Sequence, residues 1–221
     1  MNTDFDLKPT LDFLKGLKRN NNRYWFESHR QRYQLARSQF EAYVTALIQE
    51  LAPVDGLGGL SAKECIFRLN RDLRFSKDKS PYKIHMSAYI APGGRKSRKL
   101  GYYVHVSPGD QSMIAGGMHE PDPQQIARWR QTIDRDPGPF KRIIDEKSFR
   151  QYFGGVAGER LKTAPKGFPR DHPQLELLRL KQVTAMRPLA DKDLLGRNLV
   201  QDTLRTFKAM KPFLKHLEKL G

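Results

Sequence analysis

A change in hydrophobic period along the chain restricts the folds that this sequence can adopt. Apolar residues recur every three to four positions before residue 52 and after residue 121, which is the period of a helix. Between these stretches, segments such as YKIHMSAYIA and YYVHVS alternate apolar and polar residues, which is the period of a strand. No helical stretch separates the alternating segments, so we expect their strands to pair antiparallel rather than through βαβ units.

These periods predict an α+β protein that forms a single domain over residues 1–221. Its centre is expected to be a mostly antiparallel sheet, a meander of about four or five strands over residues 64–119. Helices from both ends of the chain, within residues 10–52 and 122–221, are expected to cover this sheet.

Individual elements follow from local signals. Thr10 is expected to cap a short amphipathic helix. The Asn20-Asn21-Asn22 triplet is expected to break this helix and to cap the next one, a long helix from Arg23 to about Leu51. The segments CIFRLNRDLRF and KQVTAMRPL are expected to form further strands. In SMIAGGM, Gly116-Gly117 leave room for the close approach of a ligand or of another backbone, and a β-bulge is the alternative explanation.

The net charge indicates which partners the protein attracts. Forty Lys and Arg against 24 Asp and Glu give a charge of +16, and 38% hydrophobic residues are typical of a globular chain. Such an excess favours nucleic acid, nucleotides or anionic membrane surfaces as partners. The alternative is that the charge only keeps the protein soluble.

Several classes of protein are excluded by residues that the chain lacks. Cys65 is the only cysteine, so the chain forms no intramolecular disulfide and no cysteine-based zinc site, and a cytoplasmic location is expected. The first residues lack a signal-peptide pattern, and no apolar run is long enough to span a membrane. No GxxxxGK[ST], GxGxxG, HExxH or GxSxG motif occurs. The sequence therefore indicates no metal site and names no cofactor.

The segment RLNRDLRF, residues 68–75, has two chemically different faces if it is extended. The apolar face contains Arg71, whose guanidinium needs an ion-pair partner among apolar neighbours. The other face presents Arg68, Asn70, Asp72 and Arg74. The following segment, SKDKSPYK, has the residues of a turn and adds lysines beside this polar face.

Arginine and lysine side chains at this density can bind a phosphate group, and arginine does so with two parallel hydrogen bonds. The predicted anion-binding residues are Arg68, Arg71, Arg74, Lys77, Lys79 and Lys83. The alternative is structural: the arginines and Asp72 form an exposed ladder of ion pairs, and the lysines belong to a surface turn.

Two residues are predicted to have catalytic roles. Asp72 can position a reacting group, and His105 can transfer a proton, as can Tyr82. His105 shares a strand face with Tyr103, and His85 is a second histidine on a neighbouring segment. The alternative is that these histidines are hydrogen-bonded structural residues.

The basic segment also carries a family resemblance. The pattern RxxRDxRFxxDKxxY, with eight fixed positions in fifteen, resembles the signature of a bacterial family of unknown function. It includes Phe75, Asp78 and Tyr82. Further landmarks, FLKGLKRNNNRYWF, GYYVHVSPG, AGGMHEP and PKGF, extend the resemblance over nearly the whole chain. The resemblance implies no settled activity, substrate or cofactor.

Three functions are compatible with these observations. The first is a protein that binds, and acts on, a phosphate-bearing ligand such as a nucleotide or a nucleic-acid end through the Arg/Asp/Lys cluster. The second is a basic nucleic-acid-binding module without catalysis. The third is a scaffold whose motif is a structural ion-pair network. The sequence does not decide whether the protein is an enzyme.

Overall fold

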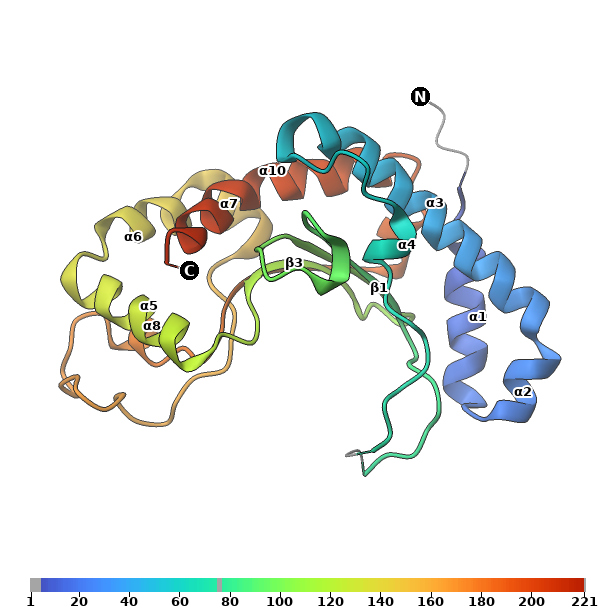
Figure 1. The fold of residues 1–221 in the computed structure, drawn as a ribbon, viewed down its shortest axis with the longest axis horizontal. Helices are drawn as coiled ribbons and strands as arrows, with labels where there is room; N and C mark the ends of the chain where they lie inside the picture. Colours follow the sequence, from blue (N-terminus) through green and yellow to red (C-terminus); the bar gives the residue numbers. More distant parts are fainter. Residues whose placement is uncertain (1–4, 75–76, 221) are drawn as a thin grey trace. The chain divides into compact units, whose positions relative to one another are not determined.

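The computed structural model describes residues 5–74 and 77–220 and has the α+β fold that the sequence predicts (Figure 1). The described residues form a sheet with the strand order β1-β2-β3-β4, namely β1 Met86–Ile90, β2 Tyr102–Val106, β3 Ser112–Met118 and β4 Val183–Leu189. The four-stranded antiparallel sheet agrees with the prediction, but only β1, β2 and β3 lie within residues 64–119, and β4 joins the sheet after four helices. The segment KQVTAMRPL supplies β4, as predicted.

Helices precede and follow these strands. Before the sheet lie α1 Lys8–Arg19, α2 Arg23–Ser28, α3 Arg30–Asp55 and α4 Ala62–Cys65. The short 3-10 helix η1, Gly94–Lys96, follows β1. After β3 come α5 Pro123–Arg135, α6 Gly138–Asp145, α7 Lys147–Phe153 and α8 Leu175–Leu178. After β4 come α9 Asp191–Leu194 and α10 Leu199–Glu218.

Two predicted helix boundaries are wrong. Thr10 does not cap α1; it lies inside the helix and donates its hydroxyl to the carbonyl of Ala36 at 2.8 Å. Pro9 explains the earlier start, because proline is favoured in the first helical turn, where its missing N–H is not needed. The long helix is interrupted at His29, whose backbone leaves the helical region. Ser28 and His29 both place side-chain atoms 2.9 Å from the carbonyl of Trp25, which favours an end to α2 there.

The chain divides into two compact units. The first comprises residues 1–98, 103–114 and 188–204, and the second comprises residues 99–102, 115–187 and 205–221. The single domain over residues 1–221 stays a prediction.

The core of the first unit forms where α1 packs on α3, and Figure 1 shows α1, α2 and α3 side by side. The ring of Phe13 contacts the rings of Trp25 and Tyr33, with centroids 5.8 and 5.5 Å away. The hydroxyl groups of Tyr43 and Thr203 form a buried hydrogen bond of 2.8 Å. Helices α3 and α4 also contact β1, so this core supports the first strand of the sheet.

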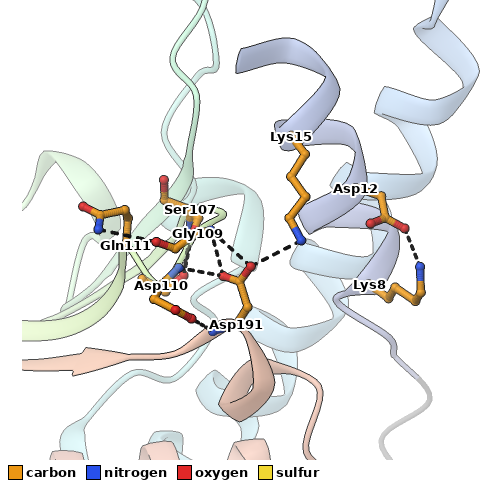
Figure 2. A network of polar contacts seen from close by, with 9 residues as sticks. Lys8, Asp12, Lys15, Ser107, Gly109, Asp110, Gln111 and Asp191 are labelled. Carbon is orange, nitrogen blue, oxygen red and sulfur yellow. Dashed lines mark hydrogen bonds and ion pairs between the residues drawn. The ribbon is translucent and has the colours of Figure 1, made fainter. Parts of the chain in front are cut away.

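The turn between β2 and β3 is held by a carboxylate from a distant part of the chain (Figure 2). Asp191, at the start of α9, accepts hydrogen bonds of 3.1 Å from the backbone amides of Gly109 and Asp110. Asp110, which has a positive φ of 58°, accepts a bond of 2.7 Å from the amide of Asp191 in return. Lys15 adds an ion pair at 3.3 Å, so three segments of the first unit meet at this turn.

The second unit has an aromatic core around Trp129, whose side chain is fully buried and donates to the carbonyl of Leu177 at 3.2 Å. Gly116 is needed here because a Cβ at this position would lie 2.8 Å from the carbonyl oxygen of Gly101 and would overlap Met210 of α10. The glycine pair therefore accommodates another backbone and a helix, and the approach of another backbone is one of the possibilities that the sequence leaves open.

Candidate functional site

The predicted anion-binding residues lie on two extended segments, residues 66–74 and 77–85, which we call the basic arm. Figure 1 shows the two segments running side by side away from β1. The strand predicted for CIFRLNRDLRF is wrong, because only isolated antiparallel bridges form there, Ile66 with Ala88 and Asn70 with Tyr82. Phe75 of the motif lies outside the described residues.

A bulge interrupts the pairing of the basic arm. The bridged residues Ile66 and Asn70 are four positions apart, whereas their partners Ala88 and Tyr82 are six positions apart, so the second segment contains two extra residues. The regular bonds from Lys83 N to the Leu69 carbonyl and from Phe67 N to the Ser87 carbonyl bracket these extra residues. A bulge changes the direction of the side chains that it contains, and here it contains His85.

The alternation of faces persists although the segment is not a regular strand. Leu69 is 4% exposed, whereas Arg68, Asn70, Asp72 and Arg74 are all exposed. Arg71 lies on the more buried face, and 25% of its side chain is exposed. The period-two pattern therefore predicts the exposure of these side chains correctly, because any extended backbone points successive side chains in opposite directions.

Two ion pairs form within the motif itself. Arg71 pairs with Asp78, and Asp78 also accepts hydrogen bonds from the hydroxyl and the amide of Ser80, at 2.5 and 2.9 Å. The Ser80 hydroxyl and then Arg71 hold the pKa of Asp78 well below its usual value. Arg74 binds Asp72 with two bonds, of 2.7 and 3.0 Å, which lowers the pKa of Asp72. The partner that Arg71 requires is thus a motif residue.

The lysines of the arm occupy different environments. Lys77 and Lys79 are exposed, and Lys79 donates to the carbonyl of Leu73 at 3.2 Å. Lys83 is half-buried, and its ammonium lies 5.6 Å from the centroid of the Phe67 ring. Burial, and then the charge of Arg68, lower the pKa of Lys83. No carboxylate of the described residues forms an ion pair with Lys83 or Arg68.

The motif residue Tyr82 anchors the arm to the N-terminal helices. Its ring is buried and stacks on Phe26 with centroids 4.2 Å apart. Asn21 hydrogen-bonds with both backbone groups of Tyr82, donating to the carbonyl at 2.9 Å and accepting from the amide at 3.1 Å. The sequence offers the Asn triplet only as a helix breaker and cap, and Asn22 does cap α2. Nothing in the local pattern indicates the role of Asn21.

The two histidines lie together beside the bulge. The imidazole rings of His85 and His105 stack with centroids 4.2 Å apart, and the hydroxyl of Tyr103 lies 3.0 Å from Nδ1 of His105. Burial, then the charges of His105 and Lys83, lower the pKa of His85 to about 4, and burial lowers that of His105 to about 4. Burial also raises the pKa of Tyr103. All three groups are therefore neutral near pH 7.

The structure brings some of the predicted residues together and leaves others separate. The charge of Lys83 helps to lower the pKa of His85, and the charge of Arg68 helps to lower the pKa values of both Lys83 and Asp72. Among the described residues, in contrast, no hydrogen bond or ion pair joins the two predicted catalytic residues, Asp72 and His105. Asp72 is instead engaged by Arg74 on the arm.

Other candidate chemistries find little support in the described part of the chain. It contains no group of three or more His, Cys, Asp or Glu side chains that could hold a metal. Cys65 is fully buried, and burial, with the charge of Glu64, raises the pKa of its thiol to about 11, which makes it a poor nucleophile. No helix formed by the described residues combines the length and the apolar character of a membrane span.

The fold and the site define an α+β protein with an open antiparallel sheet, whose first strand continues into a basic arm. The chain belongs to the conserved hypothetical protein family DUF2461, whose family model matches residues 9–216. Neither the curated proteins nor the solved structures contain a match to it. Membership in a family of unknown function is therefore confirmed, and the function has to be argued from the site.

Proposed function

We propose that this protein binds a phosphate-bearing ligand, a nucleotide or a nucleic-acid end, with Arg68 and Lys83 as the principal cationic contacts. The observation that carries this proposal is the environment of Lys83. Its side chain is half-buried, its ammonium lies over the Phe67 ring, and burial and the charge of Arg68 lower its pKa. A partly desolvated cation beside another cation is unfavourable by itself, and a bound anion would remove that cost.

The ion pairs of the motif support the same assignment. Asp78 and Asp72 neutralise Arg71 and Arg74, so these two arginines are the less available members of the predicted anion-binding set. Asp78 and Asp72 are 60% and 44% exposed, and exposed pairs contribute little to folding stability. This exposure favours a ligand site over a purely structural network.

The same residues allow catalysis without requiring it. A neutral imidazole such as His105 can donate or accept a hydrogen bond at the ligand, but a pKa near 4 makes it a weak base at pH 7. We therefore propose binding as the primary function. A role of Asp72 and His105 in a reaction stays a prediction.

Isothermal titration calorimetry with AMP, ATP and pyrophosphate tests the proposal. Arg68→Gln and Lys83→Met should each weaken binding about tenfold or more, because a hydrogen bond to a charged group contributes about 1.5–3 kcal/mol. Lys208→Met, which removes an exposed lysine from α10, is the matched control and should bind like the wild type. The proposal is wrong if no phosphate compound binds, or if all three variants bind equally well.

A second candidate function, nucleic-acid binding without catalysis, is favoured by the net charge of +16. It differs from the first in needing no particular residue, because many phosphate contacts contribute to non-specific binding. The dependence of binding on salt separates the two functions.

A further inference from the structure

The last helix, α10, presents a row of cations along one side, which we call the α10 stripe. The stripe follows the helix at intervals of three or four residues and consists of Arg205, Lys208, Lys211, Lys215 and, directly after the helix, Lys219. At about 100° per residue the five lie within an arc of about 120°, and they extend over about 21 Å. Lys211 is half-buried, and the other four are exposed.

The opposite side of α10 is fixed in the core of the second unit. The buried ring of Phe207 stacks on Tyr102 with centroids 4.2 Å apart. The buried ring of Phe213 contacts those of Phe140 and Phe149, with centroids 5.8 and 5.4 Å away. These contacts fix the rotation of the helix, so the stripe is a rigid row that faces outward.

A further cation reaches the end of the stripe from another helix. Nε of Arg128, on α5, donates a hydrogen bond of 2.5 Å to the carbonyl of Leu220, the residue after Lys219. The side chain of Arg128 remains exposed. A contact between two helices therefore extends the stripe beyond α10.

The lysines of the stripe differ from other cations of the second unit. None of the ion pairs formed by the described residues involves Lys208, Lys215 or Lys219. Elsewhere in this unit a lysine pairs with an acidic neighbour, for example Lys181 with Glu159 at 3.2 Å. Acidic side chains in the described part of the chain therefore leave the charge of these three lysines without a direct counter-charge.

The spacing of the stripe is unfavourable for the helix by itself. Like charges at i,i+3 and i,i+4 repel one another, and three such steps lead from Lys208 to Lys219. The negative end of the helix dipole favours Lys215 and Lys219, which lie in the last turn and directly after it. Arg205 and Lys208 lie two turns or more before the end, where this effect is lost. A bound polyanion would replace the repulsion by attraction.

The side chains of α10 indicate which polyanion fits. A helix that binds a membrane surface inserts apolar side chains, and a protein that binds single strands stacks bases on aromatic rings. Among the described residues, none of the exposed large apolar side chains lies on α10. A nucleic-acid duplex needs neither kind of contact, because it presents about one phosphate charge per 1.7 Å of its axis.

We propose that the α10 stripe binds the phosphate backbone of a nucleic-acid duplex, with Lys208, Lys215 and Lys219 as phosphate contacts. The inference goes beyond the proposed function, because it assigns a second surface, in the second unit, to a ligand that the basic arm does not need. Contacts of this kind are independent of sequence, since the phosphates carry no sequence information.

The stripe is tested with labelled DNA and RNA duplexes of about 12 base pairs, about twice the length of the stripe at 3.4 Å per pair. Fluorescence anisotropy at increasing salt measures the affinity and its salt slope. We expect Lys208→Gln/Lys215→Gln/Lys219→Gln to reduce the slope by about two to three, at about 0.9 per lost contact, and to weaken binding at least about tenfold at low salt. Glutamine forms helices about as well as lysine, so the fold is kept.

The matched control is Lys141→Gln/Lys147→Gln/Lys162→Gln, which removes the same charge from exposed lysines of the same unit outside α10. It should keep the affinity for the duplex within about threefold, as for a small change in net charge alone. Equal losses in the two triple variants would overturn the inference, because net charge rather than the stripe would then attract the duplex. Absence of duplex binding by the wild type would also overturn it, as would binding only to vesicles of phosphatidylserine and phosphatidylcholine.

Two single variants separate this inference from the proposed function. Lys208→Met should bind AMP like the wild type and the duplex several-fold more weakly. Lys83→Met should lose affinity for AMP and keep most of its affinity for the duplex. If AMP fails to bind while the stripe variants behave as expected, only the proposed function is wrong. If AMP binds as expected while the stripe variants bind the duplex like the wild type, only the inference is wrong.

Discussion

His85 and His105 are stacked, half-buried imidazoles whose pKa values lie near 4, below the ordinary value of 6.5. The folded state therefore favours the neutral rings, and the unfolded chain binds more protons between pH 4 and pH 6.5. The stability that the neutral pair contributes is complete above pH 6.5 and is lost as the pH falls towards 4. We expect the free energy of unfolding to decrease by roughly 2 kcal/mol over this range, after allowance for solvent screening.

Urea denaturation between pH 4 and pH 8 measures this dependence. The double variant His85→Gln/His105→Gln should show a flatter profile below pH 6.5 than the wild type. His119→Gln, which changes an exposed histidine, is the control and should keep the wild-type profile. If the double variant and the wild type lose stability in parallel, the two imidazoles are not the groups that titrate.

At the scale of elements, the basic arm is attached to the N-terminal helices through Asn21. We expect Asn21→Ala to lower the free energy of unfolding by about 1–2 kcal/mol, because it leaves the amide and the carbonyl of Tyr82 without their partner. Hydrogen exchange at the Tyr82 amide should also become faster.

Asn20→Ala is the matched control for this prediction. The exposed side chain of Asn20 donates a hydrogen bond of 3.1 Å to the carbonyl of Gly16, so its loss should cost about 0.5 kcal/mol or less. Chemical denaturation of both variants measures the two changes in the free energy of unfolding. Equal destabilisation by the two substitutions would mean that the hydrogen bonds from Asn21 to Tyr82 do not attach the arm to the N-terminal helices more strongly than an ordinary surface bond.

The β2–β3 turn depends on a second long-range contact, that of Asp191 (Figure 2). Burial opposes ionisation of this carboxyl, but the amides of Gly109 and Asp110, with Lys15, outweigh it and lower its pKa. We expect Asp191→Ala to destabilise the protein by about 1–2 kcal/mol and to accelerate amide exchange at both turn residues.

Lys15→Met separates the contributions at this turn. It removes only the ion pair, whose lysine is 48% exposed, and should change stability by less than about 1 kcal/mol. If instead Lys15→Met is the more damaging change, the ion pair rather than the amide bonds holds the turn.

At the scale of the whole molecule, the charge of +16 predicts association with nucleic acid that depends steeply on salt. Binding of duplex DNA, followed by fluorescence anisotropy from 50 to 300 mM salt, should weaken with a slope of about −0.9 for each phosphate contacted. Arg68→Gln and Lys83→Met should each reduce this slope by about one at most. If no binding occurs at the lowest salt, nucleic-acid binding without catalysis is excluded as the function.

Part of the fold and of the candidate site follows from local pattern. The two hydrophobic periods predict the helical ends and the antiparallel meander, and the alternation in RLNRDLRF predicts that Arg68, Asp72 and Arg74 are exposed. The position of Asn22 before an aromatic helical segment predicts a cap. These features depend only on residues that are near one another in the sequence, so they can be predicted from the sequence directly.

The sequence by itself thus determined the α+β class, the alternation of the basic segment and its family. Only the tertiary structure decided that Asn21 binds Tyr82, 61 residues away, and that the bulge gathers Lys83, His85 and His105. The physical reason is that period and composition report which face of an element is apolar. They do not report which side chains from distant segments meet. That depends on how the elements pack and on where a bulge changes the register between two paired segments.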